Sequence, residues 1–261
     1  MRVTRLLRVA LNVRDLRAST AFYVEALGFE PDGAERPASG LPGRARLLRR
    51  GAQFLELSAP AEPGPPYPDD TAANDLWFQH CALVTDDIGA AHARALARGG
   101  GVSGVRPFSR GGPVTLPGAI AAWKFRDPDG HPLELIQFPR PDKLTRSGID
   151  HSAISVSDAG RSIRFYEGLG LSVGSRQVNA GPAQDRLDGL DGVAADVVAL
   201  LPPSPAPHVE LLGYRHPSGR PARPRPAGLA ATRLVFAADV PAPVLTPDPD
   251  GHWILALPDQ G

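Results

Sequence analysis

The sequence predicts an α+β fold made of four βαβββ modules, of which the fourth is truncated and has lost its helix. Three observations favour this fold class. An alternating strand, an Asp and a helix carrying Phe-Tyr occur together twice, in residues 8–29 and 151–171. An Asp-Pro-Asp-Gly turn followed by an apolar strand also occurs twice, in residues 127–138 and 248–257. Self-similarity of this kind is typical of a fold built from repeated units.

Both copies of the first motif predict where a helix begins and ends. Asp15 and Asp158 suit the N-cap position, because a carboxylate there accepts the unpaired backbone N–H groups of the first helical turn. Gly28 and Gly170 follow the last apolar residue of each helix and suit the C-terminal stop, where a positive φ is common. Residues 1–60 and 151–212 therefore predict two equivalent modules.

The remaining strands complete the modules. The first module is expected to have strands around residues 46–49 and 54–58, and the third around residues 197–201 and 209–212. The second has a strand at residues 77–85, a helix at residues 88–98, and strands at residues 120–126 and 133–138 joined by the first Asp-Pro-Asp-Gly turn.

The fourth module keeps strands at residues 233–237 and 248–257, with a short Pro-containing segment where a helix is expected. We therefore divide the chain into residues 1–140, holding modules one and two, and residues 148–261, holding module three and the truncated module four.

Composition excludes several classes of function. The 261 residues carry a net charge of zero, which argues against the broad basic surface of a nucleic-acid-binding protein. The single cysteine, Cys81, excludes an internal disulfide framework and a cysteine-rich zinc site. No segment is apolar enough to span a bilayer, and Arg5 and Arg8 interrupt the apolar N-terminus. We expect a cytoplasmic protein whose partner is a small-molecule substrate.

Charged and polar side chains inside apolar strands suggest a metal site. Glu134 lies in the middle of an apolar strand, where an unpaired charge costs free energy. His151 opens the strand that begins the second half, His80 lies inside another strand, and Glu210 occupies a strand of the third module. Taken singly, such a His is usually a hydrogen-bonded core residue and such a Glu usually faces water. Strand alternation points Cys81 to the face opposite His80, and so into the core.

The four modules, the Phe-Tyr…Leu-Gly helices and the Asp-Pro-Asp-Gly turns resemble the vicinal oxygen chelate superfamily, which includes glyoxalase I, extradiol dioxygenases and bleomycin-resistance proteins. The resemblance covers almost the whole chain. It implies that two modules face each other in a cup-like mixed sheet that holds a divalent metal ion. It also implies that the first and fourth strands of each module supply the metal ligands.

The ligand positions implied by this resemblance favour one arrangement of the modules. If the second module pairs with the third, as in glyoxalase I dimers, one cup collects all four ligands. If neighbours in sequence pair instead, neither cup is complete. In the crossed arrangement the other cup has no metal set, and Arg8 forms a salt bridge with Glu56. The candidate metal ligands are His80, Glu134, His151 and Glu210, and the other cup holds Arg8, Glu56, Thr232 and Leu255.

The resemblance implies a metal-dependent isomerase, lyase or epimerase of the glyoxalase type that acts through an enediolate. Glu210 or Glu134 would be the catalytic base, and the cofactor one divalent ion: Zn, Ni, Co, Mn or Fe(II). An Fe(II) extradiol-type dioxygenase is the alternative, and a non-enzymatic binding or resistance protein is a second one. The protein would be a monomer or a homodimer.

Several further polar residues are candidates for substrate contacts. His208 shares a strand face with Glu210 and could act as a second acid-base group. Four residues are expected in loops that could close over the cup: Gln184, Arg186, Tyr214 and His216.

Overall fold

The computed structural model describes residues 1–98, 105–139, 148–204 and 207–259, and all structural statements concern these residues. The boundary between the two sequence halves, at residues 140–147, lies outside them. The first module consists of β1 (Val3–Asn12), α1 (Leu16–Leu27), β2 (Glu30–Pro31), β3 (Arg36–Pro37), β4 (Gly43–Arg50) and β5 (Gln53–Pro60). The second consists of β6 (Gln79–Val84), α2 (Ile88–Arg98), β7 (Arg106–Pro107), β8 (Val114–Thr115), the short 3₁₀ helix η1 (Pro117–Ala119), β9 (Ala121–Arg126) and β10 (Pro132–Gln137).

The second half of the chain repeats this order with changes. The third module consists of β11 (Gly148–Ser155), α3 (Ala159–Leu169), β12 (Ser172–Ala180), α4 (Pro182–Asp188), β13 (Ala194–Leu201) and β14 (His208–His216). The fourth consists of β15 (Thr232–Ala238), β16 (Val244–Pro247) and β17 (Trp253–Pro258). The described residues between β15 and β16 form no helix, which confirms the predicted truncation. The sequence analysis gave no ranges for β12, α4 and β16, nor for the short elements β2, β3, β7, β8 and η1.

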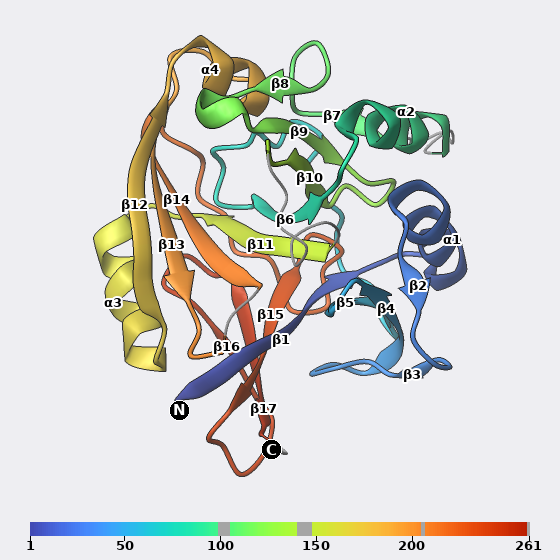
Figure 1. Ribbon diagram of the computed structural model, residues 1–261. Helices are drawn as coiled ribbons and strands as arrows, with labels where there is room; N and C mark the ends of the chain where they lie inside the picture. The colour runs from blue at the N-terminus through green and yellow to red at the C-terminus, as the bar shows by residue number, and fades with distance from the viewer. Residues whose placement is uncertain (99–104, 140–147, 205–206, 260–261) are drawn as a thin grey trace.

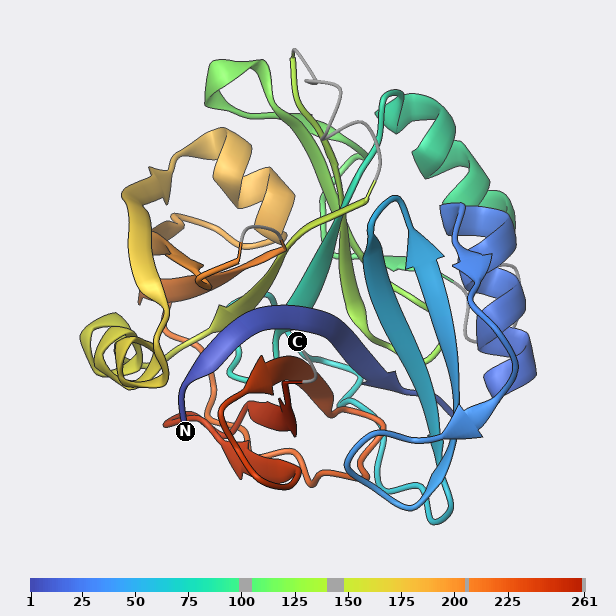
Figure 2. The ribbon, with the colours of Figure 1, turned by 60° about the horizontal axis from the view of Figure 1, so that its bottom comes forward.

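The modules pair across the two halves of the chain. One mixed sheet has the order β16-β17-β15-β1-β5-β4-β2, so it combines modules four and one. The other has the order β12-β13-β14-β11-β6-β10-β9-β7, so it combines modules three and two. The halves meet where β1 pairs antiparallel with β15, and where β6 pairs antiparallel with β11. Figures 1 and 2 show the two curved sheets, and the crossed arrangement is confirmed.

The helix ends follow the sequence signals. The Asp15 carboxylate accepts the backbone N–H groups of Arg17 and Ala18, and the Asp158 carboxylate accepts that of Arg161. Gly28 and Gly170 adopt φ values of 72° and 104°, in the left-handed region that favours glycine. Both predicted caps are therefore confirmed.

The helices α1, α2 and α3 cover the outer faces of the sheets, and the core lies between these helices and the sheets, whereas α4 borders the hollow of the second sheet. The helix α1 packs on β4 and β5, α2 packs on β9 and β10, and α3 packs on β12, β13 and β14. Alternate residues of the central strands, including Cys81, Trp123 and Phe125, belong to the main buried apolar cluster. Cys81 thus points into the core, as predicted. The intervening residues of the same strands face the hollow of the second sheet.

The two Asp-Pro-Asp-Gly turns connect modules within each half of the chain. The Tyr23 hydroxyl on α1 donates to Asp127 at 2.8 Å, and the Tyr166 hydroxyl on α3 donates to Asp248 at 3.1 Å. The histidine that follows each turn contacts a backbone carbonyl of the neighbouring module, and the pairs are His131 with Asn12 and His252 with Ser155. These contacts join neighbouring modules. The repetition of Tyr, Asp and His in both halves therefore has a structural explanation and does not require a metal site.

Candidate metal centre

Backbone register brings the candidate ligands together on the hollow face of the second sheet. One row of paired residues crosses five strands and consists of Lys124, Glu134, Ala82, His151 and His208. The adjacent row contains His80, Ala153 and Glu210. The alanines in these rows leave room between the longer side chains. Four strands from two modules therefore supply the four candidate ligands.

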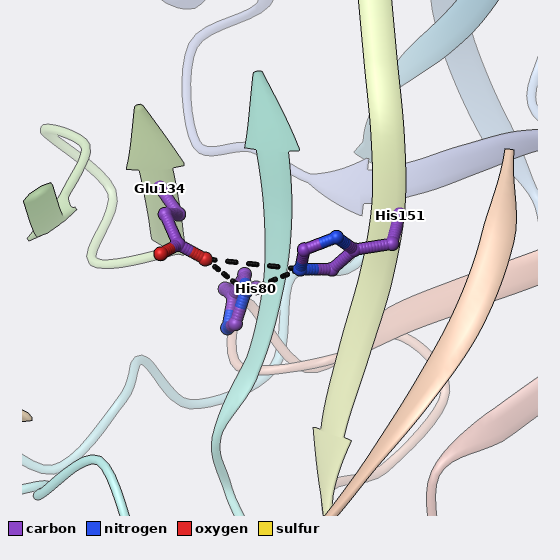
Figure 3. Close-up of side chains that lie close together, drawn as sticks. All are labelled: His80, Glu134 and His151. Atoms are coloured by element: carbon purple, nitrogen blue, oxygen red, sulfur yellow. Dashed lines mark hydrogen bonds and ion pairs between the residues drawn. The ribbon is translucent and has the colours of Figure 1, made fainter. Parts of the chain in front are cut away.

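Three of the four candidate ligands converge closely. The Nε2 atom of His80 lies 2.8 Å from Oε2 of Glu134 and 3.2 Å from Nε2 of His151. The Nε2 atom of His151 lies 3.7 Å from the same Glu134 oxygen. Figure 3 shows the three side chains, from β6, β10 and β11, pointing toward one another. All three are buried.

Glu210 lies at the edge of this group. Its Oε2 atom is 3.5 Å from Nε2 of His151, and its Oε1 atom is 3.4 Å from Nε2 of His208. The side chain is 20% exposed, compared with 6% for Glu134. Among the interactions of the described residues, Glu210 contacts His151 but neither His80 nor Glu134. It is therefore the more accessible of the two carboxylates.

An irregularity in β11 adds a carboxylate that the sequence analysis missed. The pairing of β11 with β6 shifts register between Ile149 and His151, so Asp150 is an extra residue in the strand. Its Oδ2 atom lies 2.8 Å from Nδ1 of His151. A carboxylate on the outer nitrogen of a ligand histidine fixes the ring and increases its basicity. Strand alternation hides this contact in the sequence, because consecutive residues normally point to opposite faces.

The charges of the site are unbalanced without a cation. Burial lowers the pKa of His80. Burial also lowers the pKa of His151, but Glu210, Asp150 and Glu134 outweigh it and raise that pKa well above its usual value. Burial raises the pKa of Glu134, whereas hydrogen bonds from the two histidines outweigh this effect and hold it well below its usual value. Three carboxylates thus surround one histidine pair.

The donor set fits a divalent ion. Metal–ligand bonds of about 2.1 Å separate two donor atoms by about 3.0 Å at right angles and about 3.4 Å in a tetrahedron. The measured separations, from 2.8 to 3.7 Å, lie around these values. Imidazole nitrogens and carboxylate oxygens suit Zn, Ni, Co, Mn and Fe(II). His80, Glu134 and His151 could hold the ion, and Glu210 lies within reach as a fourth group.

The equivalent positions of the first sheet contain no such set. The Arg8 Nε atom donates to Glu56 at 2.8 Å, so the predicted salt bridge is present. The Ser39 backbone N–H and hydroxyl also donate to the Glu56 carboxylate. Leu255 is buried opposite Val235, whereas Thr232 is buried opposite Leu11 of the main apolar cluster. A guanidinium therefore neutralises the carboxylate in this cup.

A cavity of about 160 Å³ opens over the candidate metal centre. Its lining includes His80, Glu134, His151, Asp150 and Glu210, together with several apolar side chains. Gln184 and Tyr214 also line it, but they lie in α4 and β14, so the expectation that they belong to loops was wrong. Arg186 and His216 likewise belong to α4 and β14. No apolar period in this segment is long enough to predict the seven-residue helix α4.

A comparison with known protein families agrees with this architecture. The family described as "Glyoxalase/Bleomycin resistance protein/Dioxygenase superfamily" matches residues 5–135, half of the chain. The chain belongs to this superfamily. Members of the superfamily act on small-molecule substrates and bind a divalent metal.

Solved structures share the whole fold. Glyoxalase I from Zea mays has 18% sequence identity and a TM-score of 0.65, and the match covers 98% of this chain and 92% of that one. A putative dioxygenase from Bacillus subtilis has 11% identity and a TM-score of 0.56, with 100% and 86% covered. No curated protein matches the chain. None of the helices in the described part of the chain is long and apolar enough to cross a membrane.

Proposed function

We propose that the protein is a divalent-metal-dependent enzyme of the glyoxalase type, an isomerase, lyase or epimerase. Its substrate would be a small molecule with two adjacent oxygens, converted through an enediolate. The observation that carries the proposal is the convergence of His80, Glu134 and His151 within 4.8 Å of one another, with Glu210 beside them. A divalent ion bound there would polarise a substrate oxygen and lower the energy of an adjacent carbanion.

The residues of the chain would divide the remaining tasks. His80, Glu134 and His151 would hold the ion, and Asp150 would orient the His151 ring. Glu210 would remove and return the proton at a substrate carbon, because it is the more exposed carboxylate. Burial raises the pKa of Glu210, but the charge of His151 and a hydrogen bond from His208 outweigh burial and bring it to about 2 while His151 is protonated. An ion bound to neutral His151 would supply the positive charge instead. Glu210 is therefore ionised at neutral pH, as a base must be.

One observation favours a second candidate. His80, His151 and Glu134 form a complete two-histidine, one-carboxylate set, and Glu210 lies outside it. This set is the usual ligand group of Fe(II) oxygenases. A ring-cleaving extradiol-type dioxygenase would then use Glu210 only as an acid-base group.

The identity of the metal and the type of reaction separate the two candidates. The protein is purified without oxygen, and its metal content is measured for the wild type, His80→Ala and His151→Ala. The wild type is then tested for oxygen uptake with catechols and for deuterium incorporation from D₂O into α-hydroxyketones. Deuterium incorporation that the wild type shows and Glu210→Gln lacks supports the isomerase. Oxygen uptake with bound iron supports the dioxygenase. A metal content that both alanine variants leave unchanged refutes both.

A further inference from the structure

A second polar cluster lies in the wall of the same cavity, on the β9 side of Glu134. Lys124 on β9 is 4% exposed and lines the cavity. Its Nζ atom donates to Oδ1 of Asp188 at 2.7 Å and lies 5.6 Å from the centre of the Phe78 ring. A buried lysine is rare unless it is paired, and Asp188 is the hydrogen-bonded partner of this one.

Asp188 gathers donors from three elements. It is the last residue of α4, and its side chain is fully buried. Besides Lys124, it accepts hydrogen bonds from Gln184 Nε2 at 2.8 Å and from the Tyr214 hydroxyl at 3.0 Å. Lys124, Gln184 and Tyr214 all line the cavity. Asp188 therefore fixes three polar side chains in the cavity wall.

The helix that carries Asp188 is itself held in place. The Ser109 hydroxyl donates to the backbone carbonyl of Leu187 at 2.8 Å and accepts the backbone N–H of Lys124. The Arg110 backbone N–H donates to the carbonyl of Arg186 at 2.8 Å. These bonds tie the short helix α4 to the segment before β9. The cluster is thus a rigid part of the cavity.

Lys124 keeps donors that the described residues do not use. An ammonium carries three N–H groups, and the only hydrogen bond of Nζ to a described residue is that to Asp188. Buried donors require acceptors, and the cavity is the open space that Lys124 borders. The charges of Lys124 and Asp188 cancel, and the carboxylates of Glu134 and Glu210 also act on Lys124, so the cluster does not favour an anionic group. An uncharged oxygen, such as a carbonyl or a hydroxyl, is the acceptor that suits such a pair.

We propose that Lys124 orients the substrate by donating to an uncharged acceptor oxygen, while the metal centre holds the adjacent oxygens. This inference rests on the proposed function, since it assigns the second contact of the same substrate. A cavity of about 250 Å³ continues from the first and shares five lining residues with it, namely Leu116, Ile120, Gln177, Asn179 and Gln184. The apolar part of a longer substrate would lie between the isoleucine and leucine of this set.

The test uses chelating probes that differ in one group. Benzohydroxamates chelate a metal through two adjacent oxygens. Those with an acetyl group at the ortho, meta or para position add an acceptor, and the matching isopropyl compounds have the same shape without it. Binding to the zinc-loaded full chain is measured by calorimetry. Because Lys124 and Lys143 are the only lysines, protein labelled with ¹⁵N-lysine reports ligand contact at an ammonium group directly.

At least one acetyl probe is expected to bind about tenfold more tightly than its isopropyl counterpart, as for a hydrogen bond from a charged donor. The same probe shifts the Lys124 ammonium resonance. The double variant K124M with D188N removes both charges together, so no unpaired charge remains buried. It should abolish the preference for acetyl while leaving the zinc content and the affinity for the isopropyl probe unchanged.

Several results would overturn the inference. One is the absence of an acetyl preference at all three positions, and another is a preference that survives in the double variant. A third is an equal loss of both probes together with zinc, which would make Lys124 a structural residue. If zinc and every hydroxamate fail to bind to the wild type, the proposed function fails and this inference fails with it. If zinc and the isopropyl probes bind normally, only the inference is at stake.

Discussion

Glu56 and Glu134 occupy equivalent strand positions but have different side-chain partners. Glu56 is neutralised by the guanidinium of Arg8 and by hydrogen bonds from Ser39. Glu134 instead faces two imidazoles, which can bind a metal through their nitrogens. Arg8 in place of a histidine gives Glu56 a permanent ion pair, and the first cup also lacks a second carboxylate, since Leu255 stands where the second cup has Glu210.

Removing the guanidinium from the first cup should destabilise the fold. Arg8→Met leaves the fully buried carboxylate of Glu56 without its charged partner. Loss of one partner of a buried pair costs about 3 kcal/mol in the free energy of unfolding, which urea denaturation would measure. Arg5→Met is the matched control, because Arg5 is exposed in its ion pair and the expected change is below about 1 kcal/mol. Equal effects of the two variants would contradict this account.

Glu56 should also make the stability depend on pH. Burial raises its pKa, but Arg8 and the hydrogen bonds from Ser39 and Ser58 outweigh burial and place it below the ordinary value of 4.5. Below pH 4.5 the unfolded chain therefore binds a proton that the folded chain does not. The stabilisation is complete above that pH and is lost as the pH falls through the folded-state pKa.

Thermal unfolding of the wild type and of Glu56→Gln between pH 3 and pH 7 would test this. The variant should be less stable at neutral pH, and the difference between the two proteins should shrink toward acid pH. A difference that stays constant over the whole range would exclude Glu56 as the titrating group.

At the scale of elements, the irregularity in β11 has a measurable role. Asp150→Asn keeps the shape of the side chain but removes the charge that faces Nδ1 of His151. Loss of such an outer partner lowers metal affinity about 10- to 100-fold, and competition with a chromogenic chelator would measure this. The control is Asp196→Asn, since Asp196 pairs with Arg215 at the surface and should not affect metal binding. An unchanged affinity in Asp150→Asn would show that the contact does not support the site.

The hydrogen bonds that connect α1 and α3 to the two Asp-Pro-Asp-Gly turns lead to a second prediction. Tyr23→Phe and Tyr166→Phe each remove the hydroxyl that donates to a buried aspartate. Each should lower the free energy of unfolding by about 1 to 3 kcal/mol. The two losses should add in the double variant, because the pairs share no partner. Chemical denaturation of the four proteins gives the comparison, and a strongly non-additive result would mean that the two links are coupled.

Most of the helices and the longer strands could be predicted from the sequence. The elements that the prediction missed have physical explanations. Caps, turns and alternating strands are local signals, so α1, α3 and the paired strands β9 and β10 were predicted. The helix α4 is too short for a periodic pattern, and Gly181 before it and Pro182 at its first position also suit a loop. The contacts of Asp150 and Asp188 depend on strand register and on tertiary packing, which no local pattern encodes.

At the scale of the molecule, the site requires both halves of the chain. His80 and Glu134 come from the proposed first domain, residues 1–140, whereas His151 and Glu210 come from the proposed second, residues 148–261. Each half alone would leave the edges of β1 and β6, or of β11 and β15, without partners. The two sheets thus depend on the pairing between halves.

Separate expression of the two halves would test this dependence. Each half alone should aggregate or remain unfolded, while the co-expressed halves should form a one-to-one complex. A divalent metal at 100 times its dissociation constant should stabilise that complex by about 2.7 kcal/mol, and His151→Ala should abolish the gain. Size-exclusion chromatography and thermal unfolding measure both results. A stable, metal-binding half on its own would contradict the prediction.

The joint between β6 and β11 has a consequence for the behaviour of the protein in dilute solution. Both strands belong to one polypeptide, so every group of the candidate centre is already tethered to the others. An assembly of separate subunits loses a shared site when its concentration falls below the dissociation constant. Here the metal affinity, and the turnover of each molecule at a fixed free-metal concentration, should stay constant when the protein is diluted, whether or not two copies associate.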